Sequence, residues 1–125
     1  MSTSSMSLDT PLSAQLGRYL DLAATQAKLT AANMANIDTP GYRAQGFDFD
    51  AAMRSALADA DAGRATGPIA ISEVDGLVAR PDGNDVSMDR ESLNLAEAQL
   101  KFKTGVALLR LEYQKISDAI HADSK

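Results

Sequence analysis

A long apolar repeat in the last third of the chain constrains the fold more than any other feature. Between Met88 and Ile120, ten positions spaced alternately by four and three residues carry eight apolar side chains, and no proline interrupts them. These positions are Met88, Ser92, Leu95, Gln99, Phe102, Val106, Leu109, Tyr113, Ile116 and Ile120. This spacing is typical of a helix face that packs against other helices. The repeat therefore predicts a helix over residues 87–121, about 50 Å long at about 1.5 Å per residue.

Such a helix needs a long partner, which the spacing alone leaves open as this chain or another copy. We expect the assembly seam to consist of Leu95, Phe102, Val106, Leu109, Tyr113, Ile116 and Ile120. A second row of small and large apolar residues is predicted to widen this face: Leu93, Ala96, Leu100, Ala107 and Leu111. An ordinary core helix of a small bundle shows the same stripe.

A second helix is predicted near the N-terminus, over residues 11–36. Thr10 can cap it, and Pro11 suits the first helical position. Its apolar face is made largely of alanine, so it buries little area and should depend on the C-terminal helix. The preceding residues 1–9 are rich in Ser and Thr without periodicity, and we expect them to be disordered. Residues 10–125 are then a single domain.

Residues 37–86 should form a loop, a short helix and a β-hairpin between the two long helices. The short helix is expected at about residues 50–60, with Phe47 and Phe49 anchoring the loop before it. The run Ile-Ala-Ile-Ser-Glu-Val at residues 69–74 is interpreted as a strand of period two, and Asp75-Gly76 predicts a turn into residues 77–80. The turn at 81–86 should start the long helix, with Asp85 or Ser87 as its N-cap.

Composition excludes several classes of function. The chain has no Cys and one His, so we predict no disulfide, thiolate chemistry, metal site or cofactor. A formal net charge of -5 argues against nucleic-acid binding. No nucleophile elbow or phosphate loop is visible, so neither an enzyme nor a small-molecule substrate is predicted. No apolar run is long enough to span a bilayer, and no cleavable signal peptide is apparent.

The end of the first helix carries the most specific motif. Residues 32–42 read Ala-Asn-Met-Ala-Asn-Ile-Asp-Thr-Pro-Gly-Tyr. Pro40 and Gly41 favour a turn, and Asn36 can take the left-handed conformation that ends helices. Asn33 and Asn36 lie one turn apart, so both amides can bind loop backbone. On physics alone, a plain helix terminator explains this stretch.

This motif resembles the N-terminal signature of the bacterial flagellar rod, hook and hook-filament-junction proteins. The residues that carry the resemblance are Asn33, Asn36, Thr39, Pro40, Gly41 and Tyr42. Asp82 to Val86 and the Leu-Ala-Glu-Ala-Gln-Leu-Lys-Phe run at 95–102 resemble the C-terminal half of the shortest proximal-rod subunits. The match covers about half the chain, and residues 43–80 lie outside it.

The resemblance implies a mainly α fold whose N- and C-terminal helices pack as an antiparallel coiled coil. It implies a structural subunit that assembles helically, with its own copies and other rod subunits, into the periplasmic drive shaft that transmits torque. The implied partners are the basal-body membrane ring, the hook-basal-body adaptor protein and the flagellar type III export apparatus, which exports such chains without a cleaved signal. The alternative is a self-contained soluble helical domain that binds a partner helix, as a chaperone or adaptor does.

Overall fold

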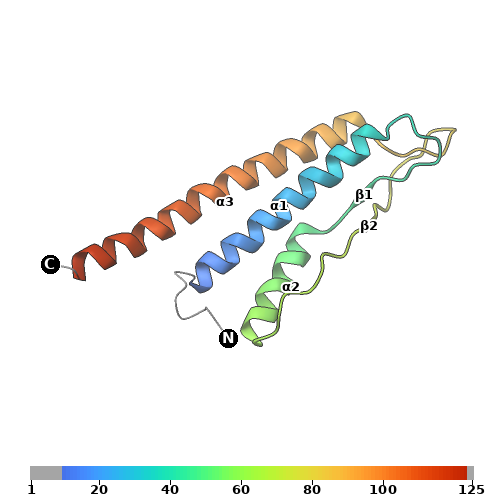
Figure 1. Cartoon of the computed structure of the whole chain (residues 1–125). Coiled ribbons are helices and arrows are strands. Elements are labelled where there is room, and N and C mark those ends of the chain that lie inside the picture. Colours follow the sequence, from blue (N-terminus) through green and yellow to red (C-terminus); the bar gives the residue numbers. More distant parts are fainter. Residues whose placement is uncertain (1–9, 124–125) are drawn as a thin grey trace.

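The computed structural model describes residues 10–123 as three helices and one short two-stranded sheet (Figure 1). In chain order the elements are α1 (Pro11–Ala35), β1 (Gln45–Gly46), α2 (Phe49–Asp61), β2 (Ser72–Glu73) and α3 (Met88–Asp123). The fold is mainly α, with two long helices packed together, as the sequence predicts. The disorder expected for residues 1–9 lies outside the described residues.

Helices α1 and α3 lie side by side and antiparallel (Figure 1). At one end the Thr10 hydroxyl donates to a Glu112 carboxylate oxygen at 3.2 Å. At the other end the Asn33 amide donates to Glu91 at 2.7 Å. Because Thr10 lies opposite Glu112, residues 113–123 of α3 extend beyond the first turn of α1, by about 16 Å at about 1.5 Å per residue.

Thr10 caps α1, as expected. Its hydroxyl accepts from the Ser13 N–H at 3.0 Å, while the Ser13 hydroxyl accepts from the Thr10 N–H at 2.7 Å. This reciprocal pair satisfies two backbone donors at the helix start, and Pro11 has no N–H that needs a partner.

The two long helices approach most closely through small residues of α3. Ala98 and Gly105 are buried, and a Cβ built on Gly105 would lie 2.7 Å from Leu20 Cδ2 and 3.1 Å from Tyr19 Cδ1. On the α1 side the interior contains Leu16, Leu22 and Ala23. At Gly105, α3 therefore lies too close to side chains of α1 to carry a side chain of its own.

The predicted rows of α3 are arranged differently around this contact. The seam positions Leu95, Val106, Leu109 and Ile116 are half-buried, whereas Phe102, Tyr113 and Ile120 are exposed. The second row of Leu93, Ala96, Leu100, Ala107 and Leu111 is exposed and does not face α1. Residues two positions apart are rotated by about 200° on a helix, so Leu93, Leu100 and Ala107 lie opposite the buried Glu91, Ala98 and Gly105.

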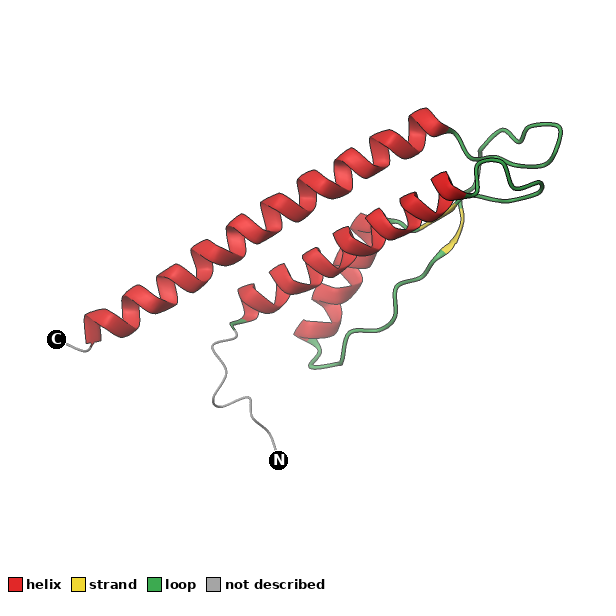
Figure 2. Cartoon of the chain, turned by 45° about the horizontal axis from the view of Figure 1, so that its top comes forward, coloured by secondary structure: helices red, strands yellow, loops and turns green. Residues whose placement is uncertain are grey.

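Helix α2 packs against α1, and Figure 2 shows it beside the lower half of that helix. The Asp48 carboxylate caps α2 by accepting from the Ala51 N–H at 2.9 Å. The Phe49 ring meets the Tyr19 ring edge-on at 5.3 Å, and Lys101 Nζ lies 3.9 Å from the centre of the Phe49 ring. Phe47 stacks on Phe49 at 6.1 Å, so the two rings anchor this segment on the helices as predicted.

The sheet pairs different segments from those predicted. Ser72–Glu73 pairs antiparallel with Gln45–Gly46, with Gln45 opposite Glu73, and not with residues 77–80. The Val74 N–H extends the pairing by donating to the Ala44 carbonyl at 2.9 Å. Asp75-Gly76 still forms a turn, with φ of 80° at Gly76, but the chain after it leaves the sheet and carries Arg80 to the end of α1.

Across residues 10–123, none of the helices combines the length and the apolar character that crossing a membrane requires.

Candidate functional site

The two signature segments meet where α1 ends and α3 begins. The Gly41 N–H donates to the Asp82 carbonyl at 2.8 Å, and the Asp85 N–H donates to the Tyr42 carbonyl at 3.3 Å. We call this unit, residues 36–44 and 80–86, the helix-end clasp. It joins the two ends of the long helices into one hydrogen-bonded structure.

Two glycines allow the two halves of the clasp to touch. Gly41 has φ of 75° and Gly83 has φ of 85°, a region that L side chains rarely adopt. A Cβ on Gly83 would lie 3.3 Å from the Gly41 Cα atom. The turn expected at Gly41 is confirmed, and the close approach explains why a second glycine stands opposite it.

Asn84 is fully buried and binds the end of α1. Its Nδ2 donates to the carbonyls of Asn36 at 2.9 Å and Thr39 at 2.8 Å, and its Oδ1 accepts from the Val86 N–H at 2.8 Å. The last carbonyls of a helix have no partner within the helix. Asn84 therefore supplies hydrogen bonds to the chain that leaves α1, from a segment nearly fifty residues away.

Arg80 strengthens the same connection. Its guanidinium donates to the Val86 carbonyl at 2.7 Å and to the Ile37 carbonyl. Its backbone N–H also donates to the Asn84 carbonyl at 2.8 Å. One cationic side chain thus bridges the end of α1 and the segment that leads into α3.

Asp85 fixes the second side of the clasp. Its buried carboxylate accepts from the Ala44 N–H at 2.6 Å and from Arg43 Nε at 2.9 Å. The expected alternative, Asp85 as the cap of α3, is therefore wrong. Ser87 directly precedes α3, and its hydroxyl accepts weakly from the Arg90 N–H at 3.4 Å.

Asn33 connects α1, β1 and α3. Its Nδ2 donates to the Gln45 carbonyl at 2.9 Å and to Glu91 Oε1 at 2.7 Å. Its Oδ1 accepts from the Gln45 N–H and from the Tyr42 hydroxyl, both at 3.0 Å. Because Asn33 is 1% exposed, these four bonds satisfy a polar side chain that would otherwise be buried without partners.

A buried carboxylate completes this network. Glu91 is 1% exposed, and Arg90 Nη1 donates to its Oε2 at 3.2 Å while Asn33 binds Oε1. The pKa of the Tyr42 hydroxyl is raised from its ordinary value of 10.0, first by burial and then by the carboxylates of Glu91 and Asp85. Tyr42 therefore stays protonated and keeps donating to Asn33 well into the alkaline range.

Asn36, the other amide of the motif, acts locally. Its Nδ2 donates to the Ala32 carbonyl at 2.8 Å, and its Oδ1 accepts from the Thr39 hydroxyl at 3.0 Å. Asn36 does not take the left-handed conformation that was expected for it, because its φ is -103°. The chain reverses direction at Gly41 instead.

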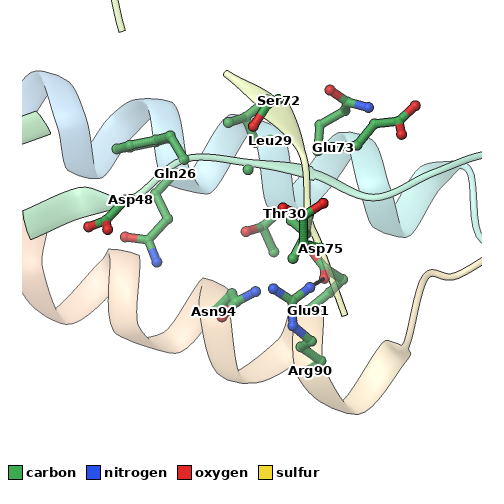
Figure 3. Close-up of a pocket in the computed structure, with 14 residues that line it drawn as sticks. Gln26, Leu29, Thr30, Asp48, Ser72, Glu73, Asp75, Arg90, Glu91 and Asn94 are labelled. Atoms are coloured by element: carbon green, nitrogen blue, oxygen red, sulfur yellow. Dashed lines mark hydrogen bonds and ion pairs between the residues drawn. The ribbon is translucent and has the colours of Figure 1, made fainter. Parts of the chain in front are cut away.

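A pocket of about 470 Å³ lies beside the network, between α1, α3 and the β ribbon (Figure 3). Its lining includes four acidic residues and one basic residue, Asp48, Glu73, Asp75, Glu91 and Arg90. Among residues 10–123, no three or more His, Cys, Asp or Glu side chains come together to hold a metal ion. The acids of this pocket lie on several elements, and Glu91 is already bonded to Asn33 and Arg90.

The structure brings the motif residues together, but several residues of the expected seam remain exposed to solvent. Asn33, Asn36, Thr39, Gly41 and Tyr42 all take part in the clasp or its bonds to β1 and α3. Sequence reasoning missed the partners Arg80, Asn84, Asp85 and Glu91. The run Asp-Gly-Asn-Asp-Val was a visible signal, because it belongs to the second signature segment.

No protein-family model matches the chain. The chain is 33% identical to the flagellar basal body rod protein FlgB of Cereibacter sphaeroides, over 87% of this chain and 95% of the relative. It is 34% identical to FlgB of Salmonella typhimurium, over 72% of this chain and 78% of the relative. It is 32% identical to FlgB of Yersinia enterocolitica, over 72% and 79% respectively. With its two signatures joined in one clasp, the chain belongs to the family of flagellar basal body rod proteins FlgB.

Proposed function

We propose that this chain is a structural, non-catalytic subunit of the proximal rod that assembles helically into the torque-transmitting drive shaft. The observation that carries the proposal is the apolar surface of α3. Leu93, Leu100 and Leu111 are each at least 60% exposed, and Phe102, Tyr113 and Ile120 are also exposed. Large apolar surfaces of this kind mark contacts with other molecules. Other copies of the chain and other rod subunits would cover them.

The remaining features fit a subunit delivered to the base of the rod. An alanine-rich α1 is a weakly stabilised helix, which favours unfolding during passage through the type III export apparatus without a cleaved signal. The membrane ring and the hook-basal-body adaptor protein would be its neighbours there. The clasp would hold the α1–α3 pair in one geometry, so that each copy presents the same faces.

Deletion and fractionation in the source bacterium test this function. We expect deletion of the gene to abolish swimming and to remove rods from purified basal bodies, and the restored wild-type chain to return both. A tagged chain should co-purify with basal bodies after detergent and alkaline washing. The control is the same tag on an unrelated cytoplasmic protein of similar size.

The alternative is a self-contained helical domain that acts as a chaperone or adaptor. It predicts that the tagged chain stays in the cell and is absent from washed basal bodies. Normal rods in the deletion strain, or a chain recovered only from the cell interior, would overturn the rod proposal.

A further inference from the structure

The outer face of α3 carries a row of leucines that nothing in residues 10–123 covers. Leu93, Leu100 and Leu111 are 60%, 66% and 60% exposed. Ala96 and Ala107 lie on the same face and are also exposed. We call these five residues the α3 stripe. It faces away from α1, because the opposite side of α3 is the one that packs against that helix.

The outer face of α1 has the complementary shape. Ala14, Ala31, Ala32 and Ala35 are exposed there, and the charged residues among them are Asp21 and Lys28. Small side chains leave shallow grooves on a helix, into which a ridge of large side chains on another helix can pack. The leucine ridge on α3 and the alanine face of α1 therefore have complementary shapes.

The charges on the two faces select one direction of packing. Glu97 and Lys103 flank Leu100 on α3, six residues apart, while Asp21 and Lys28 are seven residues apart on α1. None of the four has an ion pair within the described part of the chain. In an antiparallel arrangement Glu97 meets Lys28 and Lys103 meets Asp21. A parallel arrangement would instead bring like charges together, which is unfavourable.

We propose that the α3 stripe of one copy packs antiparallel on the outer face of α1 of a second copy. The two faces cannot meet within one chain, because they lie on opposite outer sides of the α1–α3 pair. The contact joins two different surfaces, so each added copy still presents a stripe, and the assembly grows as an open filament when the rotation between copies does not close a ring. This inference rests on the proposed function and identifies the surfaces that would carry it.

A symmetric contact between two α3 stripes is the competing arrangement. It would also place Glu97 near Lys103 of the other copy. It would leave the alanine face of α1 uncovered and Asp21 and Lys28 unpaired, and it would close as a dimer. The contact between α3 and α1 accounts for both outer faces together.

Disulfide trapping distinguishes the two arrangements, since the chain has no cysteine of its own. Ala24 lies midway between Asp21 and Lys28, so the proposed register places it opposite Leu100 of the other copy. Concentrated purified chains carrying Leu100→Cys, mixed with chains carrying Ala24→Cys, should form disulfide-linked pairs under mild oxidation. A chain carrying both substitutions should form a ladder of oligomers. Arg54→Cys, on the exposed face of α2, replaces Ala24→Cys in the matched control.

Charge reversal tests the direction of packing. Glu97→Lys in the Leu100→Cys chain should slow trapping about two- to fivefold, the range expected for an exposed ion pair. Adding Lys28→Glu to the Ala24→Cys chain should restore the rate.

Three outcomes would overturn the proposal: trapping no faster than with the Arg54→Cys control, dimers from Leu100→Cys alone at the rate of the mixture, or no rescue by the second reversal. Because these experiments use purified protein, they are independent of the deletion strain. If the deletion strain lacks rods but disulfide trapping fails, the proposed contact is rejected and the proposed function still holds.

Discussion

Asn33 and Glu91 place an amide and a carboxylate in the interior, where α1 and α3 lie beside each other. An unpaired buried charge is costly, so these side chains are stable there only because they bind each other and the further partners Gln45, Tyr42 and Arg90. Because the partners lie in α1, β1 and α3, the network also fixes how far the two helices slide past each other. A shift of α3 along α1 by one residue would separate Asn33 from Glu91.

Asn33→Ala should therefore destabilise the protein by about 2–4 kcal/mol, because it leaves Glu91 and the Gln45 backbone short of partners. Asn36→Ala is the matched control one turn later. Its bonds are local to the end of the helix, so it should cost about 1 kcal/mol or less. Urea unfolding followed by circular dichroism measures both. Equal losses in the two variants would contradict the role assigned to Asn33.

The raised pKa of Tyr42 predicts that the folded protein loses stability at alkaline pH. Its pKa is raised in the folded protein, so the fold favours the neutral hydroxyl. The stabilising contribution is complete below the ordinary pKa of 10.0 and disappears as the pH rises through the higher folded value. Unfolding measured from pH 8 to 12 should show a steeper decline above about pH 10 in the wild type than in Tyr42→Phe. Parallel declines would exclude this linkage.

The motif at the end of α1 could be recognised from the sequence, but its partners could not. Proline, glycine and two spaced amides within ten residues indicate a helix stop bound to a loop, which the structure contains. Glu91 and Asp85 instead read as helix-start residues, because an acid before or within a first turn has that role in most helices. Their actual partners, Asn33 and Ala44, are more than forty residues away, and only the folded chain brings them together.

At the scale of elements, the apolar repeat with its spacing of four and three residues predicted α3. It did not predict which row of α3 faces α1. An apolar count favours Leu, Val and Phe, whereas the buried positions include the small residues Ala98 and Gly105, and Gly105 has no room for a Cβ beside α1. The predicted pairing of the strands was wrong for a related reason. Strands of two residues have no period to read, so a turn signal at Asp75-Gly76 suggested a local hairpin in place of the pairing with Gln45–Gly46.

Gly105 gives a direct test of this close approach. Gly105→Val should destabilise the helix pair by about 1–3 kcal/mol, since its side chain would collide with Leu20 and Tyr19. Gly17→Ala is the control, because a Cβ there meets nothing within 4 Å. That change should stabilise the protein by about 0.5–1 kcal/mol through helix propensity alone. Thermal melts of the two variants should shift in opposite directions, and a stabilised Gly105→Val would refute the contact.

At the scale of the whole molecule, stabilising contacts are concentrated at one end. The clasp, the Asn33 network and the sheet all lie where α1 ends and α3 begins (Figure 1). At the opposite end, α3 continues beyond the start of α1, and Tyr113 and Ile120 stay exposed. The chain thus combines a hydrogen-bonded end with a long helix whose outer apolar side chains are exposed.

This asymmetry predicts a gradient of hydrogen exchange in the dilute monomer. Local opening is easiest where buried contacts are few. Amides of residues 113–123 should therefore exchange fastest, those in the first half of α1 at an intermediate rate, and those around Asn33 slowest.

The alanine-rich α1 adds little apolar burial, at about 25 cal/mol per Å², to offset an ordering cost of about 1 kcal/mol or more per residue. Assembly would add the missing contacts, so exchange at 113–123 should slow in purified rods while exchange near Asn33 changes little. Uniform protection along both helices of the monomer, with one cooperative melting transition, would instead indicate a self-contained helical domain.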